Sequence, residues 1–215
     1  MKLFSYFRSS AAYRVRIALN LKGLGYEYVP VHLTRGGGEQ FTPAFRQLNP
    51  QALVPMLYDG EHALTQSLAI IEYLDEICPN PALLPTAPAA RARVRALAQA
   101  VACEIHPLNN LRVLKYLTDV LGVGEEAKRA WYQHWVAEGL QALETKLVGE
   151  SGRGLYCDGG DTPGLADCCL VPQLANARRY RCDLSCYPTL LAIEKNCLAL
   201  AAFQRAAPAQ QPDAE

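Results

Sequence analysis

The segment Arg8-Ser9-Ser10 joins a cation to two hydroxyls where a short apolar stretch, residues 2–6, gives way to helical periodicity over residues 10–22. A helix N-terminus presents N–H groups that have no intrahelical acceptor, together with positive potential, so it favours an anion. A serine hydroxyl there can donate to a thiolate and hold the thiol pKa below its usual value of about 8.5. The alternative is that the two serines only cap the helix, because serine is a favoured cap.

Two further segments have groups that suit an extended peptide. Val54-Pro55 leads into an apolar run, and its X-Pro bond is a candidate for the cis isomer, which would turn the Val54 N–H and C=O outward. Gln66-Ser67 begins a predicted helix over 67–77, whose positive end suits a carboxylate. The alternatives are a proline that only starts a strand and a serine that only caps a helix. A thiol site, a strand-pairing site and a carboxylate site together fit a γ-glutamyl tripeptide.

The elements that carry these segments alternate between strand and helix over the first 78 residues. The order βαβ followed by ββα describes a thioredoxin-like domain, with a right-handed crossover in its first half. The predicted strands cover residues 2–6, 26–32, 54–58 and 63–65, and the predicted helices cover 10–22, 41–48 and 67–77, with Ser67 as the cap of the third.

The rest of the chain has a different texture. Residues 79–88 contain four prolines, which predicts a linker between two domains. Residues 89–215 are predicted to form an all-helical domain, so the fold class is α/β followed by all-α. Its helices are expected over 89–121 with a bend at Pro107, over 125–147, over 165–180 and between 189 and 205. A glycine-rich loop is expected over 149–164, and the tail 206–215 is expected to fray.

Composition excludes several classes of function. Lys plus Arg and Asp plus Glu number 21 each, so nothing indicates a nucleic-acid or membrane-surface partner. The N-terminus lacks the pattern of a signal peptide and no stretch is apolar for a membrane-spanning length, so the expected location is the cytoplasm. The eight cysteines include no CxxC pair, and only Cys182 and Cys186 lie close together. We therefore expect no metal site and interpret the cysteines as small apolar side chains in a reduced compartment.

The run from Ser9 to Leu19, Ser-Ser-Ala-Ala-Tyr-Arg-Val-Arg-Ile-Ala-Leu, resembles the zeta-class signature of the glutathione S-transferases, Ser-Ser-Cys-x-x-Arg-Val-Arg-Ile-Ala-Leu. This class includes maleylacetoacetate and maleylpyruvate isomerases, and the resemblance covers essentially the whole chain. Supporting stretches are Asn49-Pro50-Gln51, Leu53-Val54-Pro55, Gln66-Ser67-Leu68-Ala69-Ile70, His106-Pro107-Leu108-Asn109-Asn110-Leu111 and Leu165-Ala166-Asp167.

The resemblance implies a fold of the glutathione transferase type, glutathione as cofactor and a homodimer. It implies that Ser9 or Ser10 faces the glutathione sulfur. The residues that it implies for binding the tripeptide are Ser10, Gln51, Val54, Pro55, Gln66, Ser67, His106 and Asn110.

Three positions depart from the family pattern. Ala11 replaces the cysteine of the signature, as in the maleylpyruvate isomerase branch. Tyr13 occupies its aromatic position and is a candidate to line the substrate pocket. Gly164 stands where relatives carry Ser or Thr three residues before the Asp of Leu-Ala-Asp, and glycine is a slightly weaker cap.

Arginines are the candidates for binding a carboxylate substrate. The resemblance matches Arg179, just before Tyr180, to the arginine that isomerases of maleyl acids use. An arginine fork pairs bidentately with a carboxylate, so Arg8 and Arg179 are expected to hold the two ends of a diacid, with Arg112 as a third candidate. The alternative is that these are ordinary surface arginines.

These residues together predict a glutathione-dependent cis–trans isomerase of a maleyl diacid, acting by reversible addition of a thiolate. One alternative is a glutathione S-transferase that conjugates small electrophiles or dehalogenates α-halo acids. Another is a non-catalytic glutathione-binding module, because a fold alone does not fix a function. The substrate stays open at this point, since Ala11 favours maleylpyruvate while Leu108-Asn109-Asn110-Leu111 is similar to the maleylacetoacetate branch.

Overall fold

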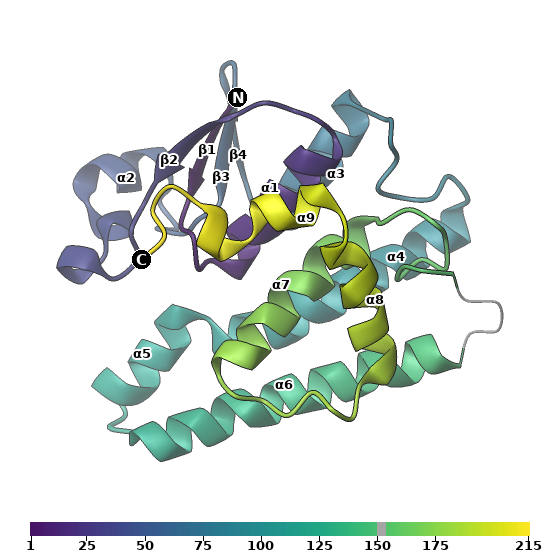
Figure 1. The fold of residues 1–215 in the computed structure, drawn as a ribbon. Helices are drawn as coiled ribbons and strands as arrows, with labels where there is room; N and C mark the ends of the chain where they lie inside the picture. Colours follow the sequence, from purple (N-terminus) through teal and green to yellow (C-terminus); the bar gives the residue numbers. More distant parts are fainter. Residues whose placement is uncertain (150–153) are drawn as a thin grey trace. The chain divides into compact units, whose positions relative to one another are not determined.

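The computed structural model describes residues 1–149 and 154–215, which divide into two compact units. Unit 1 contains Met1–Leu84 and Leu198–Glu215, and unit 2 contains Pro85–Cys197 (Figure 1). The division after Leu84 falls inside the proline-rich segment 79–88. Leu83 and Leu84 are nevertheless buried in unit 1, so this segment is not a free spacer.

Unit 1 is built on a four-stranded mixed sheet in the order β2-β1-β3-β4. β1 pairs with β2 in parallel and with β3 antiparallel, so that Leu3 lies opposite Tyr28 on one side and Leu57 on the other. This is the predicted thioredoxin-like order. The strands are β1 (Lys2–Ser5), β2 (Glu27–Pro30), β3 (Met56–Asp59) and β4 (His62–Thr65).

The helices of unit 1 pack around α1, which contacts both α3 and α9. α1 buries Val15, Ala18 and Leu19 at helical spacing and ends just before Gly23, whose φ of 65° suits glycine. The elements are α1 (Ser10–Leu21), η1 (Arg35–Gly37), η2 (Glu39–Phe41), α2 (Pro43–Leu48), α3 (Ser67–Ile77), α9 (Ala201–Ala206) and η5 (Pro208–Gln210).

The C-terminal segment differs from the sequence prediction, which assigned residues up to 215 to the helical domain and expected the tail to fray. The Nε of Arg16 donates to Ala206 O at 3.0 Å. The Asp213 carboxylate accepts from the Phe7 N–H at 3.1 Å and from the Tyr28 hydroxyl at 2.6 Å. These bonds hold the segment against the end of β1, so it belongs to unit 1 and is ordered. A pattern of Pro, Ala and Gln cannot reveal such long-range acceptors.

Unit 2 is helical, as predicted, but the expected helix over 89–121 is four elements. The chain passes from α4 into a π-helical turn, η3, and then breaks at Pro107, after which Asn110 caps a new helix. The elements are α4 (Pro88–Gln99), η3 (Ala100–Ile105), η4 (Pro107–Asn109), α5 (Leu111–Asp119), α6 (Glu125–Val148), α7 (Leu165–Arg179) and α8 (Pro188–Leu198). Residues 150–153 of the predicted loop 149–164 lie outside the described residues.

The centre of unit 2 is α7, which packs against α4 and η3 and is buried on nearly every side. α6 approaches η3 closely at Gly139, where an added Cβ would lie 2.2 Å from the Ile105 Cγ1. Within the described ranges, no helix combines the length and apolar character that crossing a membrane requires.

The start of α7 explains how Gly164 is tolerated as a cap. The Asp167 carboxylate accepts from the Gly164 N–H at 2.8 Å and from the Cys157 N–H at 3.0 Å. The aspartate therefore provides its half of the capping box although glycine supplies no hydroxyl. Asp167 is fully buried, and burial raises the pKa of its carboxyl to about 6.

Candidate functional site

The turn between β1 and α1 carries Arg8, Ser9 and Ser10. Ser9 is the N-cap of α1: its Oγ accepts from the Ala12 N–H at 3.2 Å, and it is half-buried. A hydroxyl that accepts in this way keeps its own proton for donation. Ser10 is the first residue of the helix and is only 4% exposed. Arg8 is exposed, with its guanidinium 4.7 Å from the centre of the Phe7 ring.

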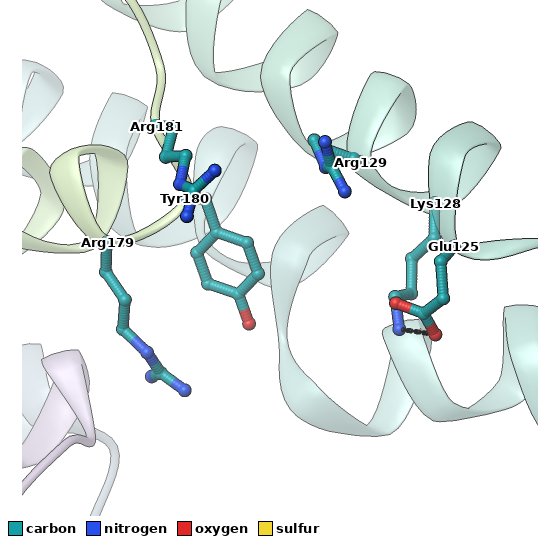
Figure 2. A pocket seen from close by; sticks show the side chains of 6 residues that line it. All are labelled: Glu125, Lys128, Arg129, Arg179, Tyr180 and Arg181. Atoms are coloured by element: carbon teal, nitrogen blue, oxygen red, sulfur yellow. Dashed lines mark hydrogen bonds and ion pairs between the residues drawn. The ribbon is translucent and has the colours of Figure 1, made fainter.

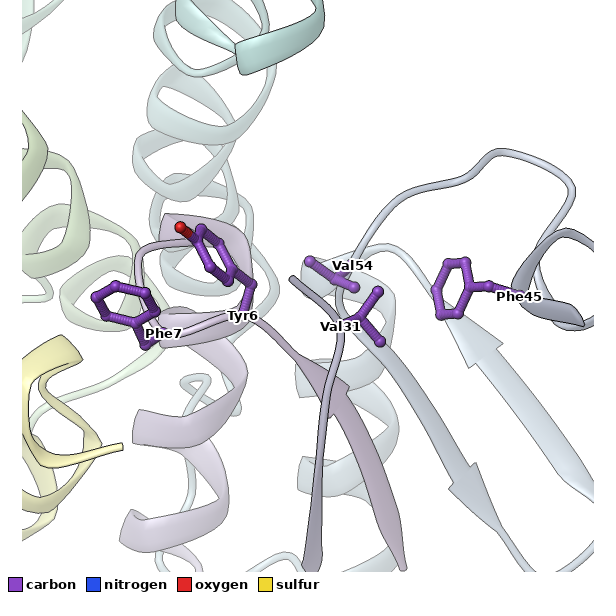
Figure 3. Close-up of a cluster of buried hydrophobic side chains, with 5 residues drawn as sticks. All are labelled: Tyr6, Phe7, Val31, Phe45 and Val54. Atoms are coloured by element: carbon purple, nitrogen blue, oxygen red, sulfur yellow. The ribbon is translucent and has the colours of Figure 1, made fainter. Parts of the chain in front are cut away.

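A cluster of buried apolar side chains supports this turn (Figure 3). Tyr6 and Phe7 follow β1 directly, and their ring centres lie 4.8 Å apart. Val31, Val54 and Phe45 complete the cluster. The same core therefore fixes the turn that bears Ser9 and the segment that bears Val54.

The segment before β3 has the predicted conformation, since the Val54–Pro55 bond is cis. The β1–β3 ladder begins at Met56, so the N–H and C=O of Val54 lie outside it. Asn49 fixes the loop ahead of it by donating to Leu53 O at 2.8 Å and accepting from the Gln51 N–H at 3.1 Å. This is a backbone edge that an extended peptide can pair with.

The start of α3 brings Gln51, Gln66 and Ser67 together. The Gln66 side-chain amide donates to Gln51 Oε1 at 3.3 Å. The N-cap is Gln66 and not Ser67, so the predicted cap is wrong by one residue. Gln66 has a φ of 67°, a left-handed conformation that is rare outside glycine and is often found at functional sites. The first N–H groups of α3 have no intrahelical acceptor and suit a carboxylate.

In unit 2, His106 and Asn110 lie side by side. The Asn110 Nδ2 is 3.4 Å from the His106 Nε2, and the Asn110 Oδ1 accepts from the Arg112 N–H at 3.1 Å. Asn110 is thus the N-cap of α5, and His106 directly follows the π-helical turn η3. The Arg112 side chain is exposed.

The C-terminal end of α7 borders a cavity of about 210 Å³ (Figure 2). Arg179 lies on its wall, with its guanidinium 5.4 Å from the centre of the Tyr180 ring. Tyr180 stacks on the buried Tyr132 with ring centres 3.7 Å apart. The lining residues are Glu125, Lys128, Arg129, Arg179, Tyr180 and Arg181.

Comparison with known proteins agrees with this arrangement. The family model "Glutathione S-transferase, N-terminal domain" matches residues 1–76. A Vibrio cholerae protein named "Probable maleylacetoacetate isomerase" is 56% identical over 99% of this chain and 97% of its own length. The chain belongs to the zeta class of the glutathione S-transferases.

Two solved structures in this class match along the chain. The holo structure of a bacterial zeta-class maleylpyruvate isomerase has a TM-score of 0.97 and 51% identity, covering 100% of both chains. A maleylacetoacetate isomerase from Methylobacterium extorquens AM1, with bound malonate and glutathione, has a TM-score of 0.95 and 44% identity, again covering 100% of both chains.

Within this transferase the structure brings some predicted site residues together and buries another in the core. Gln51 meets Gln66, His106 meets Asn110, and Arg179 lies in a cationic cavity. Tyr13 is buried with its ring 5.3 Å from the Arg16 guanidinium, so its environment is that of a core side chain.

Sequence analysis missed Arg14, although the residue stands in the family signature. Arg14 is 2% exposed, and its guanidinium donates to the Ser67 Oγ at 3.2 Å. It places a buried positive charge beside the end of α3 that suits a carboxylate. The signal was available, since an arginine on the buried face of a predicted helix needs an acceptor.

The other missed residues are Arg129 and Arg181, which join Arg179 in the cavity. They are far apart in sequence and come from different elements, so no local pattern connects them. Arg178 is adjacent to Arg179 in the sequence, but its guanidinium donates bidentately to the buried Glu194 carboxylate.

Proposed function

We propose that this transferase is a glutathione-dependent cis–trans isomerase of a maleyl diacid, either maleylacetoacetate or maleylpyruvate. The observation that carries the proposal is the state of Ser9, half-buried at the N-terminus of α1 with a hydroxyl that accepts from Ala12 and can still donate. The names of the relatives, which include both isomerases, support it.

The residues of unit 1 fit a glutathione molecule. The unpaired backbone edge at Val54 matches the peptide groups of its cysteine, and the first turn of α3 with Gln66 and Ser67 matches its γ-glutamyl carboxylate. Gln51 supports Gln66. His106 and Asn110 are additional contacts that we carry over from the family resemblance. The glutathione bound in a zeta-class relative supports the same assignment.

Glutathione, when bound, supplies the thiol whose reversible addition to the conjugated double bond permits rotation. Ser9 donates its hydroxyl proton to that sulfur and, with the positive end of α1, favours the thiolate. Because Ser10 is nearly inaccessible, we assign the sulfur contact to Ser9. Arg8 and Arg179 each anchor a carboxylate of the acid, and the cation of Arg8 also stabilises negative charge that develops on the substrate.

The competing activity is conjugation of small electrophiles or dehalogenation of α-halo acids. It needs the same serine and the same glutathione site, so it is a side activity that this geometry permits. The cationic lining around Arg179 favours an acid as the main substrate, because cations around an apolar substrate would lack a counter-charge. A non-catalytic module would need the Ser9 hydroxyl only as the cap of α1.

We also propose that the protein acts as a homodimer in the cytoplasm. The dimer rests on the family resemblance. The location rests on the interpretation of the cysteines as small apolar side chains in a reduced compartment.

The test follows the ultraviolet absorbance of maleylacetoacetate and, separately, of maleylpyruvate, with and without glutathione. We expect loss of the cis acid that requires glutathione and does not consume it, and the better substrate identifies the branch. Ser9→Ala should lower kcat/KM by about 100-fold, the effect of losing one donor to a developing anion, and more than Ser10→Ala does.

Conjugation of an aryl halide without turnover of either acid would replace the isomerase by a detoxifying transferase. A larger loss in Ser10→Ala than in Ser9→Ala, with both variants folded, would move the sulfur contact to Ser10.

A further inference from the structure

The cavity at the end of α7 is lined by more positive than negative side chains, and most of the positive ones have no acidic partner in the part of the chain that the structure describes. Lys128 pairs with Glu125 at 2.6 Å. Arg129, Arg179 and Arg181 have no acidic partner anywhere in residues 1–149 and 154–215. Three exposed guanidinium groups therefore line one small cavity without an acidic side chain among the described residues to pair with them.

Arg129 gains nothing from the dipole of its own helix. α6 begins at Glu125, so Arg129 is its fifth residue and lies just beyond the first turn, to which the effect of the helix dipole is confined. Cations at the C-terminal end of α7 are favoured by that dipole, which by itself accounts for Arg179. It does not account for a cation placed opposite on α6.

Arg181 occupies a backbone position at which glycine is the usual residue. Its φ is 56°, and the turn closes with bonds from Arg181 N–H to Arg178 O at 2.9 Å and from Cys182 N–H to Ala177 O at 2.9 Å. This is the pattern of a Schellman motif, whose left-handed residue is most often glycine. An arginine there costs stability, so the side chain has a role that glycine lacks.

The cavity has a firm frame. The Gln133 side chain of α6 donates to Tyr180 O at 3.2 Å and to Arg181 O at 3.1 Å, which ties the turn to α6. The stacked rings of Tyr132 and Tyr180 hold the turn on its other side. In Figure 2 the Arg181 side chain lies next to the Tyr180 ring, and Arg129 projects from α6 to one side of that ring. At about 210 Å³ the cavity is smaller than the roughly 300–1,000 Å³ typical of larger ligands.

We propose that this cavity binds a small dicarboxylate anion through Arg129 and Arg181 together with Arg179. The proposal does not depend on the proposed function, because binding of a dicarboxylate to these three arginines requires no turnover. It adds two arginines from outside the family signature as determinants of acid binding. Guanidinium groups from two elements hold two carboxylates better than one, so a dicarboxylate should bind more tightly than a monocarboxylate.

The test uses the full chain without glutathione and measures binding of succinate and acetate by isothermal titration calorimetry at low ionic strength. We expect succinate to bind about tenfold more tightly than acetate, and Arg129→Gln to weaken succinate about five- to tenfold. Lys146→Gln is the matched control, because it removes an exposed cation from the other end of α6 and should leave the affinity unchanged.

Arg181→Gly separates binding from folding. It should raise the melting temperature, since glycine accepts the left-handed conformation, and still weaken succinate binding. Absence of succinate binding to the unmodified protein would overturn the proposal. Succinate affinities in Arg129→Gln and Arg181→Gly that equal the affinity of the unmodified protein would also overturn it. Either result leaves the isomerase intact if turnover persists. Arginine-dependent succinate binding without turnover of maleyl acids would keep the site and remove the proposed function.

Discussion

The two units bury charges of opposite sign. Among the described residues, unit 1 buries Arg14, Arg16 and Lys22, with Asp75 as the carboxylate beside Lys22. Among the acidic and basic side chains described in unit 2, the buried ones are all carboxylates: Glu144, Asp167 and Glu194.

The difference follows from which backbone groups each unit turns inward. In unit 1 two of the three buried cations donate to carbonyls: Arg16 to Tyr6 O and Phe7 O, and Lys22 to Cys78 O at 2.6 Å at the C-terminal end of α3. Arg14 is the exception, because its guanidinium donates to the Ser67 hydroxyl. In unit 2 two of the three buried carboxylates accept from N–H groups at helix starts, whereas Glu194 accepts from the Arg178 guanidinium. Asp167 serves α7 and Glu144 serves α8, where it accepts from Thr189 and Leu190.

Helix ends and strand ends leave backbone groups that must be satisfied, and a buried group without a partner is costly. A buried charge of the complementary sign satisfies several such groups at once. For the buried charges that bond backbone groups, Arg16, Lys22, Glu144 and Asp167, the sign of the charge therefore follows the type of backbone group that faces inward. The side chains of the exposed arginines in the unit 2 cavity bond no backbone group in the described residues and differ from both sets.

The largest effect expected from this comparison is that of Arg16→Met. Its guanidinium donates to Ser5, Tyr6, Phe7 and Ala206, and the substitution leaves those oxygens buried without a donor. We expect unit 1 to lose about 3–5 kcal/mol of stability, measured by calorimetry. Hydrogen exchange should speed up in Leu198–Glu215, because Ala206 loses its anchor.

Arg16→Lys is the matched control for that variant. A lysine keeps the charge but cannot span four acceptors in two directions, so its loss should be intermediate. A methionine variant as stable as the parent would mean that the carbonyls find other donors, and the proposed link between buried cations and inward carbonyls would fail.

The next prediction concerns the pH dependence of a buried carboxylate. Burial raises the pKa of Asp167 to about 6, while its N–H bonds to Gly164 and Cys157 lower it. The folded state therefore binds the Asp167 proton more tightly than the unfolded chain does. The stability from this group is full below about pH 4 and is lost as the pH rises through 6.

Asp167→Asn provides the non-titrating reference. The difference in unfolding free energy, parent minus variant, should fall by about 2 kcal/mol between about pH 4 and pH 7 in parallel urea titrations. A difference that grows with pH would show instead that the two N–H donors outweigh burial and stabilise the ionised form.

The part of the fold that the sequence reveals is the part set by local pattern. Alternation and helical spacing are enough for the four strands and for α1 and α3, and Pro55 marks the cis bond. The assignment of Leu198–Glu215 to unit 1 depends on bonds between the two ends of the chain. Arg16 bonds Ala206, and Phe7 bonds Asp213. Sequence spacing carries no information about such bonds.

The candidate site divides in the same way. Ser9, Val54 and Gln66 lie at element ends that local patterns locate, so their region is predictable, although the cap of α3 is displaced by one residue. The candidate roles of Arg14 and Arg129 depend on neighbours in other elements, which are Ser67 for Arg14 and Arg179 with Arg181 for Arg129. Adjacent Arg178 and Arg179 look equivalent in sequence, and only the position of Glu194 distinguishes them.

That last pair gives the smallest and most closely matched test. Arg178 holds the buried Glu194 carboxylate in a bidentate bond, so Arg178→Gln should cost about 1–2 kcal/mol by leaving that charge without its partner. Arg179 faces the cavity, so Arg179→Gln should change the unfolding free energy by less than about 0.5 kcal/mol. Both arginines share the C-terminal end of α7, so the helix dipole contributes to both and cancels in the comparison. Urea unfolding of the two variants side by side measures the difference, and equal losses would mean that the cavity arginine is as structural as its neighbour.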